Sequence, residues 1–291
     1  MADRIKILIV GGSGFVGSSL TRAFVKKDYQ VFSTYHRSYT PVKGAHYVPL
    51  PTLSEKDRCD RLIRSTEPNV LIYCLGTNSE AEAEKDPKKA QMIHSNSVTH
   101  LIHASEMSKA KFIYISSDQI FSGLSGNFFE SDSTIPSSSL GKAKAGAESL
   151  VKTRSLNHLI IRCAPLLGRG PLDHPSWLDQ IRDQIVHQKK VSFQSKQIRN
   201  PVHVSFLSEV LHRAIQDDLK NKFLHVAGLT KISMHELAFQ FLKKIELPTN
   251  LLEVSDPESV MQTDYSLNFS ETLKLVETQP LFLEQSFDLF Q

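Results

Sequence analysis

Short apolar runs alternate along this chain with longer stretches in which apolar residues recur every three or four positions. The apolar runs predict strands at residues 6–10, 30–35, 70–75, 112–116 and 159–162. The amphipathic stretches predict helices at residues 18–27, 54–65, 88–107 and 142–153. Strands and helices that alternate at this spacing indicate parallel strands joined by crossover helices. The pattern therefore predicts an α/β fold, a doubly wound parallel sheet with helices on both faces.

The first predicted strand runs directly into a glycine-rich turn, ILIVGGSGFVG at residues 7–17, which the first predicted helix follows. Gly11 allows a tight turn, Gly14 lets the main chain approach a pyrophosphate, and Gly17 lets the helix pack close to the strand. The N–H groups at the helix start then hold the phosphates. The turn's other expected cofactor contacts are Ser13, Phe15 and Val16. The motif predicts a Rossmann dinucleotide-binding domain, and the alternative is a glycine-rich turn that binds nothing.

The residues after the second predicted strand bear on which dinucleotide is bound. The strand ends as Thr34-Tyr35-His36-Arg37, without the acidic residue that takes the ribose 2′-hydroxyl of NAD. Arg37 and His36 could take a 2′-phosphate instead. The other interpretation is that both are ordinary loop residues. The sequence favours NADP as the cofactor, with NAD as the second choice.

Composition and charge exclude several other classes. The formal net charge is +3 with interspersed signs, which does not predict nucleic-acid binding. No stretch approaches the ~20 apolar residues of a membrane span, and the N-terminal run is too short for a signal peptide, so the expected location is the cytoplasm. His100 and His103 lack a matching set of ligands, so no metal is expected. The three cysteines have no C-x-x-C spacing and are expected to be reduced.

Motifs in the later segments carry a family resemblance. IYISSDQIFSG at 113–123, LGKAKAGAE at 140–148 and IRCAPLLG at 161–168 resemble signatures of the dTDP-4-dehydrorhamnose reductases, which are extended short-chain dehydrogenase/reductases. DYSLNFSETLKL at 264–275 resembles that family's C-terminal segment, and Asn96 falls where the family keeps a helix-bending asparagine. RNPVHV, residues 199–204, is similar to an element of the wider nucleotide-sugar epimerase branch.

The resemblance implies a domain organisation and a set of site residues. Residues 1–164 would form the Rossmann domain, and 165–291 mainly a small α/β substrate lobe, with 200–220 packing back on the first domain. Ser117 and Lys144 match catalytic positions, where Ser117 hydrogen-bonds the substrate carbonyl and Lys144 holds the nicotinamide ribose. Asp118 and Arg199 are expected, with Ser117, to contact substrate. The further cofactor contacts are Leu75, Gly76 and Cys163.

The chain departs from the family at the catalytic tyrosine. The family places a tyrosine four residues before the lysine, so that both lie on one helix face and the ammonium lowers the phenol's pKa. Here Leu140 occupies the tyrosine position, and no tyrosine lies between Tyr114 and Tyr265. Leucine cannot donate or accept a proton. The usual proton relay is therefore absent.

Two functional classes follow. The chain is either an NADP-dependent nucleotide-sugar reductase or epimerase-like protein with an altered acid, or a weak or inactive NADP-binding regulator or scaffold. The regulatory β subunit of methionine adenosyltransferase resembles the same reductase family. Expected partners are a nucleotide sugar or another small carbonyl substrate, and a second copy of the chain in a homodimer, rather than nucleic acid or a membrane.

Because no acidic residue follows the second strand, NADP(H) should bind more tightly than NAD(H). Calorimetric titration of both dinucleotides measures the difference. Equal affinities would remove the argument from Arg37, and binding of neither would remove the dinucleotide site altogether.

Overall fold

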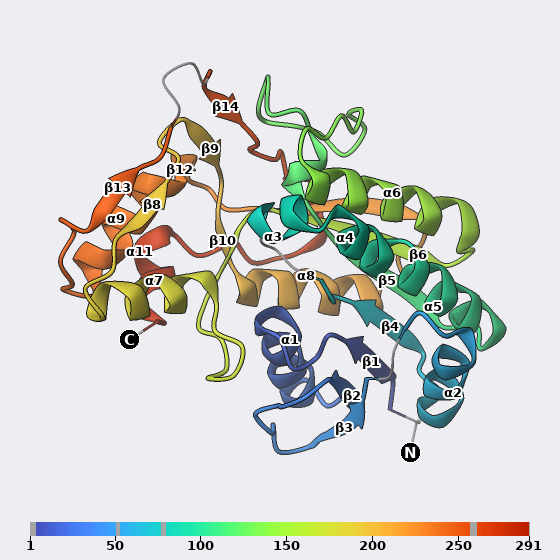
Figure 1. Ribbon diagram of the computed structural model, residues 1–291. Helices are drawn as coiled ribbons and strands as arrows, with labels where there is room; N and C mark the ends of the chain where they lie inside the picture. Colours follow the sequence, from blue (N-terminus) through green and yellow to red (C-terminus); the bar gives the residue numbers. More distant parts are fainter. Residues whose placement is uncertain (1–3, 51–52, 77–79, 257–260, 291) are drawn as a thin grey trace.

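Seven parallel strands form the central sheet of the computed structural model, which describes residues 4–50, 53–76, 80–256 and 261–290 (Figure 1). The strands are β1 (Lys6–Val10), β2 (Gln30–Tyr35), β3 (Ala45–Pro49), β4 (Val70–Tyr73), β5 (Lys111–Ser117), β6 (His158–Cys163) and β11 (Lys222–Val226). Their order is β11-β6-β5-β4-β1-β2-β3. The predicted doubly wound Rossmann sheet is confirmed.

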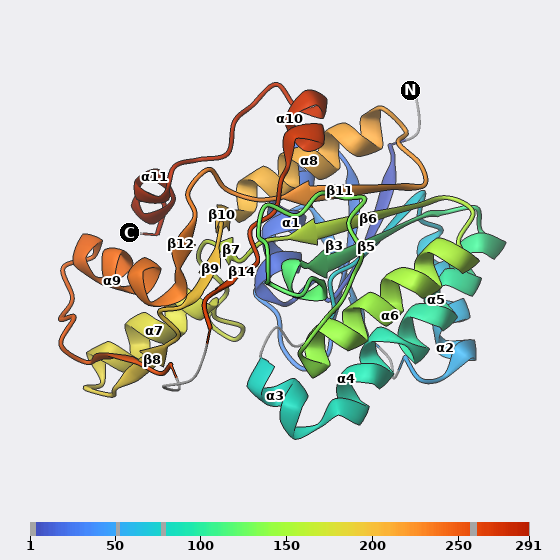
Figure 2. The ribbon, with the colours of Figure 1, turned by 90° about the horizontal axis from the view of Figure 1, so that it is seen from above.

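Helices cover both faces of this sheet (Figure 2). Alternate side chains of a strand point to opposite faces. Ile7 and Ile9 pack in one core with α1 (Phe15–Lys26) and α8 (Val204–Gln216), and Leu8 packs in the other. The other face carries α2 (Lys56–Thr66), α5 (Asn96–Met107) and α6 (Ser139–Arg154), beside which lie α3 (Glu80–Lys85) and α4 (Pro87–His94).

The structure corrects the predicted elements at several places. Strands β3 and β11 were not predicted, because the first is half-exposed and the second begins with the exposed Lys222 and contains His225 among its few apolar residues. The predicted helix 88–107 is two helices, α4 and α5, which meet at Ser95 (φ −114°, ψ −69°). The apolar periodicity continues across the break, which explains the single predicted helix. Asn96, expected to bend the helix, begins α5 with an exposed side chain.

A smaller lobe packs around its own apolar core beside the sheet (Figure 1). Its core lies among α7 (Trp177–Val186), α9 (Met234–Lys244) and α11 (Leu283–Asp288). Its strands are β8 (Val191–Phe193), β9 (Gln197–Arg199), β12 (Ile232–Ser233), β13 (Leu252–Val254) and β14 (Thr263–Asp264). The short strands β7 (Leu166–Leu167) and β10 (Val202–His203) pair with each other, and α10 (Ser270–Leu275) packs on α8 and β11. The chain therefore passes between sheet and lobe more than once.

A buried ion pair ties α6 to the sheet. Arg162 on β6 donates to both carboxylate oxygens of Glu148 on α6, with its Nη2 2.8 Å from Oε2. Its guanidinium carbon lies 5.1 Å from the ring centre of Phe121 and 4.4 Å from that of Phe223. These contacts fix α6 along β6 and so help to position the side chains that α6 presents at the sheet edge.

His225 on β11 is buried where the C-terminal segment crosses the sheet. Its Nδ1 lies 2.8 Å from the carbonyl oxygen of Asn268, and its own carbonyl accepts a hydrogen bond from Thr272. Burial, with a smaller contribution from Arg162, lowers the pKa of His225 from 6.5 to about 3. The imidazole therefore stays neutral in the folded protein while the unfolded chain takes up a proton.

Folding stability should fall as the pH drops through the range between the two pKa values of His225, 6.5 unfolded and about 3 folded. The unfolded state then binds one more proton, so this residue lowers the unfolding free energy by about 1.4 kcal/mol per pH unit. His225→Asn keeps a donor toward the Asn268 carbonyl but does not titrate. Denaturant unfolding at several pH values should show a shallower acid slope for the variant, and equal slopes would contradict this assignment.

Candidate functional site

Residues that follow four neighbouring strands meet at the carboxyl edge of the sheet. Gly11 follows β1, and the Cys74 amide after β4 donates to the carbonyl of Val10. Ser117 ends β5 and pairs in register with Cys163, which ends β6. Ligands of open α/β sheets bind outside the carboxyl ends of the strands. Most of the residues proposed from the sequence therefore lie along one edge.

The three motif glycines meet different surroundings. Gly11 has φ +91°, and a Cβ there would lie 2.8 Å from the amide nitrogen of Leu75. A Cβ on Gly17 would lie 2.2 Å from the carbonyl oxygen of Gly11, so α1 touches the turn backbone to backbone. A Cβ on Gly14 meets only that same oxygen, at 3.4 Å. The packing of the protein thus requires glycine at Gly11 and Gly17, whereas a Cβ on Gly14 would make only one ordinary van der Waals contact.

Two residues of β2 hold this turn, and sequence reasoning missed both. Thr34 accepts the Gly11 amide at its side-chain oxygen (2.9 Å) and the Ser13 amide at its carbonyl (3.0 Å). A Cβ on Gly12 would lie 1.9 Å from the Ser33 side-chain oxygen. Ser13 was expected to contact cofactor, and its amide is used within the protein. A polar Ser-Thr pair in an otherwise apolar strand was the signal available in the sequence.

The amino end of α1 is open toward the same edge. Gly14 is the N-cap residue, and no side chain in the described part of the chain caps this helix end. The Phe15 ring reaches the position that a Cβ on Gly168 would take, at 3.3 Å, while Val16 packs against the core under the sheet. Uncapped N–H groups and the helix dipole make such an end suited to an anion.

His36 and Arg37 lie exposed in the loop after β2. Three tyrosines brace this loop. Tyr39 stacks on Tyr47 with ring centres 4.1 Å apart and contacts Tyr35 at 4.4 Å. Among the residues that the structure describes, no acidic group pairs with Arg37. The loop therefore presents a cation on a stiff support next to the glycine turn.

Lys144 lies buried on α6, facing the strand ends. Burial lowers its ammonium pKa, while Cys163, Glu148 and Asp118 act in the opposite direction. No hydrogen bond or ion pair to the ammonium occurs within the described ranges. A buried ammonium without an acceptor is unfavourable, so this position is suited to a ligand rich in oxygen.

Ser117, Asp118 and Arg199 form a connected network. The Ser117 hydroxyl donates to Asp118 Oδ1 at 3.0 Å. Asp118 is fully buried in the single turn η1 (Asp118–Ile120), and Arg199 on β9 binds both of its oxygens, with Nε 2.7 Å from Oδ2. The structure thus joins all three predicted substrate residues. It also directs the serine hydrogen toward Asp118 and engages the arginine within the protein.

Leu140 is buried at the start of α6. It packs with Ala83 of α3 and Ala90 of α4. Ser138 caps the helix by accepting the Gly141 amide at 3.1 Å, and the Ser139 amide and hydroxyl both donate to Glu84. Ser138 and Ser139 therefore organise the start of α6.

His94, which the sequence analysis did not single out, lies beside Gly76. It ends α4, is 1% exposed, and its Nδ1 lies 2.9 Å from the phenol oxygen of Tyr114. Its Nε2 has no hydrogen-bond partner, and it faces Gly76, where a Cβ would lie 2.9 Å away. Gly76 has φ +149°, and its surroundings exclude any side chain.

A family model, described as RmlD substrate binding domain, matches residues 5–271. The chain belongs to this family. Two curated relatives agree with that assignment. Methionine adenosyltransferase 2 subunit beta of Rattus norvegicus is 23% identical over 253 residues, 85% of this chain and 74% of that protein. A dTDP-4-dehydrorhamnose reductase of Aggregatibacter actinomycetemcomitans is 27% identical over 165 residues, 56% of this chain and 52% of that protein.

Solved structures share the whole fold of this family member. The dTDP-4-dehydrorhamnose reductase of Bacillus anthracis, in complex with NADP, matches with a TM-score of 0.84 at 19% identity and covers 99% of both chains. The UDP-glucose 4-epimerase of Thermotoga maritima, with UDP-glucose, matches with a TM-score of 0.84 at 16% identity, covering 98% of this chain and 97% of that one. The fold assigned from the sequence motifs is confirmed.

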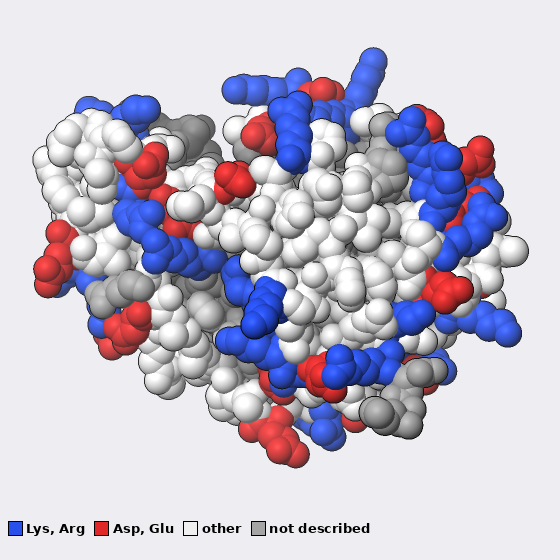
Figure 3. Space-filling view, turned by 90° about the horizontal axis from the view of Figure 1, so that it is seen from below, with Lys and Arg blue, Asp and Glu red and all other residues white. Residues whose placement is uncertain are grey.

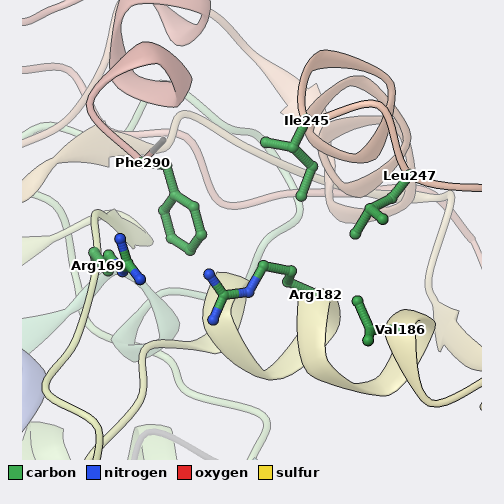
Figure 4. A pocket seen from close by; sticks show the side chains of 6 residues that line it. All are labelled: Arg169, Arg182, Val186, Ile245, Leu247 and Phe290. Carbon is green, nitrogen blue, oxygen red and sulfur yellow. The ribbon is translucent and has the colours of Figure 1, made fainter.

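A pocket of about 260 Å³ lies in the lobe (Figure 4). It is lined by Arg169, Arg182, Val186, Ile245, Leu247 and Phe290. The guanidinium carbon of Arg182 lies 5.9 Å from the Phe290 ring centre. None of the residues selected from the sequence lines this pocket.

The charged surface is mixed. On the face in Figure 3, Lys and Arg side chains gather along the boundary between lobe and sheet, beside a broad uncharged area. Among the described residues, no helix is long and apolar enough to cross a membrane, and no group of three or more potential ligands could hold a metal ion.

Substitutions at Gly14 and Gly17 should separate binding from folding. A Cβ on Gly14 makes only an ordinary contact at φ −70°, so Gly14→Val should cost about 1 kcal/mol, because valine is a poorer N-cap residue, yet abolish dinucleotide binding. Gly17→Ala meets a backbone carbonyl and should cost about 2 kcal/mol or more. Thermal unfolding and calorimetric titration of each variant provide the test. Unimpaired binding by Gly14→Val would show that no ligand lies against this turn.

Proposed function

We propose that this family member binds NADP(H) and a nucleotide sugar or related carbonyl compound at the carboxyl edge of the sheet, with an altered and weak reductase or epimerase-like activity. The observation that carries the proposal is the glycine turn. The protein requires glycine at Gly11 and Gly17 for its own packing, whereas nothing in the described chain forbids a Cβ on Gly14, and a ligand lying against this turn would explain a glycine there. The open amino end of α1 supports a pyrophosphate at the same place.

The residues present fit this cofactor along its length. Arg37 offers a cation where a ribose 2′-phosphate would lie, and Lys144 offers a buried donor on the far side of β1. The NADP complex of the Bacillus anthracis reductase supports the same choice of cofactor. Bound NADPH would supply a hydride to a carbonyl carbon. The chain's own part is to orient both molecules and to deliver a proton to the carbonyl oxygen.

Delivery of that proton is the weak point of this site. Leu140 has no group that ionises, and the Ser117 hydrogen is directed to Asp118 rather than outward. General acid–base catalysis typically contributes about 10²–10⁴-fold in rate. Positioning alone still accelerates a reaction, so slow turnover is the expected behaviour.

The second candidate function is a cofactor-binding regulatory or scaffold subunit. The buried, apolar surroundings of Leu140 favour it, because they replace the usual acid with packing between α6, α3 and α4. The similarity to methionine adenosyltransferase 2 subunit beta also supports it. Both candidates need the dinucleotide, and they differ in whether a keto sugar is reduced.

Replacement of Leu140 by tyrosine tests the chemistry. Leu140→Tyr should raise the rate of NADPH oxidation with a dTDP-4-keto sugar by about 10²-fold, because a phenol would stand four residues before Lys144. Leu140→Phe is the matched control, since it adds the ring without the hydroxyl and should not raise the rate. Overpacking would cost about 1–3 kcal/mol in either variant, so thermal unfolding accompanies the assay.

The outcomes separate the candidates. Wild-type turnover of about 10 per second would show that another group supplies the proton. Tight NADPH binding with no turnover by wild type or Leu140→Tyr would favour the regulatory subunit. Failure of wild type to bind either dinucleotide would reject the proposal itself.

A further inference from the structure

The unpartnered nitrogen of His94 lies at the edge of the proposed cofactor site. The imidazole is 1% exposed, yet among the described residues nothing hydrogen-bonds its Nε2. This nitrogen faces Gly76, the exposed residue two positions after Cys74 at the end of β4. Buried polar atoms are nearly always paired, so an exception next to a binding edge indicates a missing partner.

The tautomer of His94 follows from its other nitrogen. The phenol of Tyr114 is fully buried, and its one hydrogen bond within the described ranges is to His94 Nδ1 at 2.9 Å. Burial of the imidazole, with a smaller contribution from the charge of Lys144, lowers the pKa of His94 to about 3, so the ring is neutral. The Tyr114 hydroxyl hydrogen needs an acceptor, and His94 Nδ1 is the atom that can accept it. Nε2 therefore carries the hydrogen and is a donor without an acceptor.

A second unsatisfied donor lies nearby. Lys144 lies on α6, which packs against α4, the helix that ends at His94. No acceptor for its ammonium occurs in the described part of the chain, and its charge contributes to the lowered pKa of His94. Neither residue can accept from the other in these protonation states. A ligand between them must therefore bring oxygen acceptors, such as a hydroxyl pair.

The order of the strands says which part of a dinucleotide this would be. Arg37 follows β2, on one side of β1, whereas His94 and Gly76 lie beside β4, on the other side. With the pyrophosphate at the start of α1, the 2′-phosphate end extends toward Arg37. The opposite half, which carries the nicotinamide ribose, then lies over the ends of β4 and β5.

We propose that His94 is a cofactor-positioning residue whose Nε2–H, together with Lys144, holds a hydroxyl of the nicotinamide ribose, directly or through one ordered water. The inference rests on the proposed NADP(H) binding. Nε2 lies directly behind the exposed Gly76, where the absence of a side chain leaves the ring covered by main chain alone on that side.

Two substitutions of His94 divide its two hydrogen bonds. His94→Asn keeps an acceptor for Tyr114 near the place of Nδ1 but loses the outer donor. His94→Gln keeps a donor near the place of Nε2. By calorimetry, His94→Asn should bind NADPH about tenfold more weakly than wild type, and His94→Gln should stay within about threefold.

Adenosine 2′,5′-bisphosphate, which lacks the nicotinamide riboside, is the control ligand. Its affinity should be the same for wild type and both variants if His94 acts on the ribose directly or through a water that the ribose holds. An equal loss for this ligand and NADPH would indicate a purely structural residue and would overturn the proposal. Thermal unfolding of the free proteins checks that each variant is folded.

Nitrogen-15 NMR of the His94 ring gives a readout that does not need the cofactor. The free protein should show the neutral tautomer with hydrogen on Nε2, and NADPH should shift that nitrogen more than Nδ1. Hydrogen on Nδ1, or unchanged NADPH affinity in His94→Asn, would overturn the role of His94 alone. Absence of NADPH binding to wild type would overturn the proposed function as well, which distinguishes the two failures.

Discussion

The ion pair between Asp118 and Arg199 determines how the two parts of the molecule meet at the site. Asp118 is buried at the end of β5, and Arg199 comes from the three-stranded sheet of the lobe. A buried carboxylate left without its cation is strongly destabilising, so the lobe and the strand end are held in one arrangement. Ser117 is drawn into the same network. The positions of Ser117 and Arg199 beside the end of β5 therefore depend on this contact.

Much of the sheet follows from local sequence, because a strand buried on both faces has to be apolar throughout. Strands β1 and β2 begin and end at the predicted residues. Strand β11 escapes such reasoning, since its membership depends on pairing with β6, more than fifty positions earlier in the chain. The lobe's strands of two or three residues carry no periodicity from which they could be predicted.

The residues of the candidate site also fall into those that local sequence predicts and those that depend on tertiary contacts. The glycine turn could be predicted because the reasons for its glycines lie in the local chain. The contacts of Gly11 and Gly17 agree with the roles assigned to them. The contacts of Thr34 with Gly11 and of His94 with Tyr114 could not be predicted, because folding brings these residues together from distant parts of the chain. Contact of Arg199 with substrate was inferred from a motif. The motif does not show that the Arg199 guanidinium binds Asp118 within the protein. Sequence patterns identify groups with chemistry, and tertiary contacts decide which way each hydrogen points.

The late arrival of β11 has a consequence for synthesis of the chain on the ribosome. Until residue 226 has left the ribosome, β6 lies at the edge of the sheet without β11 beside it. All six residues of β6, HLIIRC, are buried in the complete protein. Such an edge invites pairing with other chains. Even then, His225 lacks its hydrogen bonds to Asn268 and Thr272 until the C-terminal segment has been made. A nascent or truncated chain that ends in the lobe is thus aggregation-prone, and the protein reaches its protected state only when nearly all of it has been made.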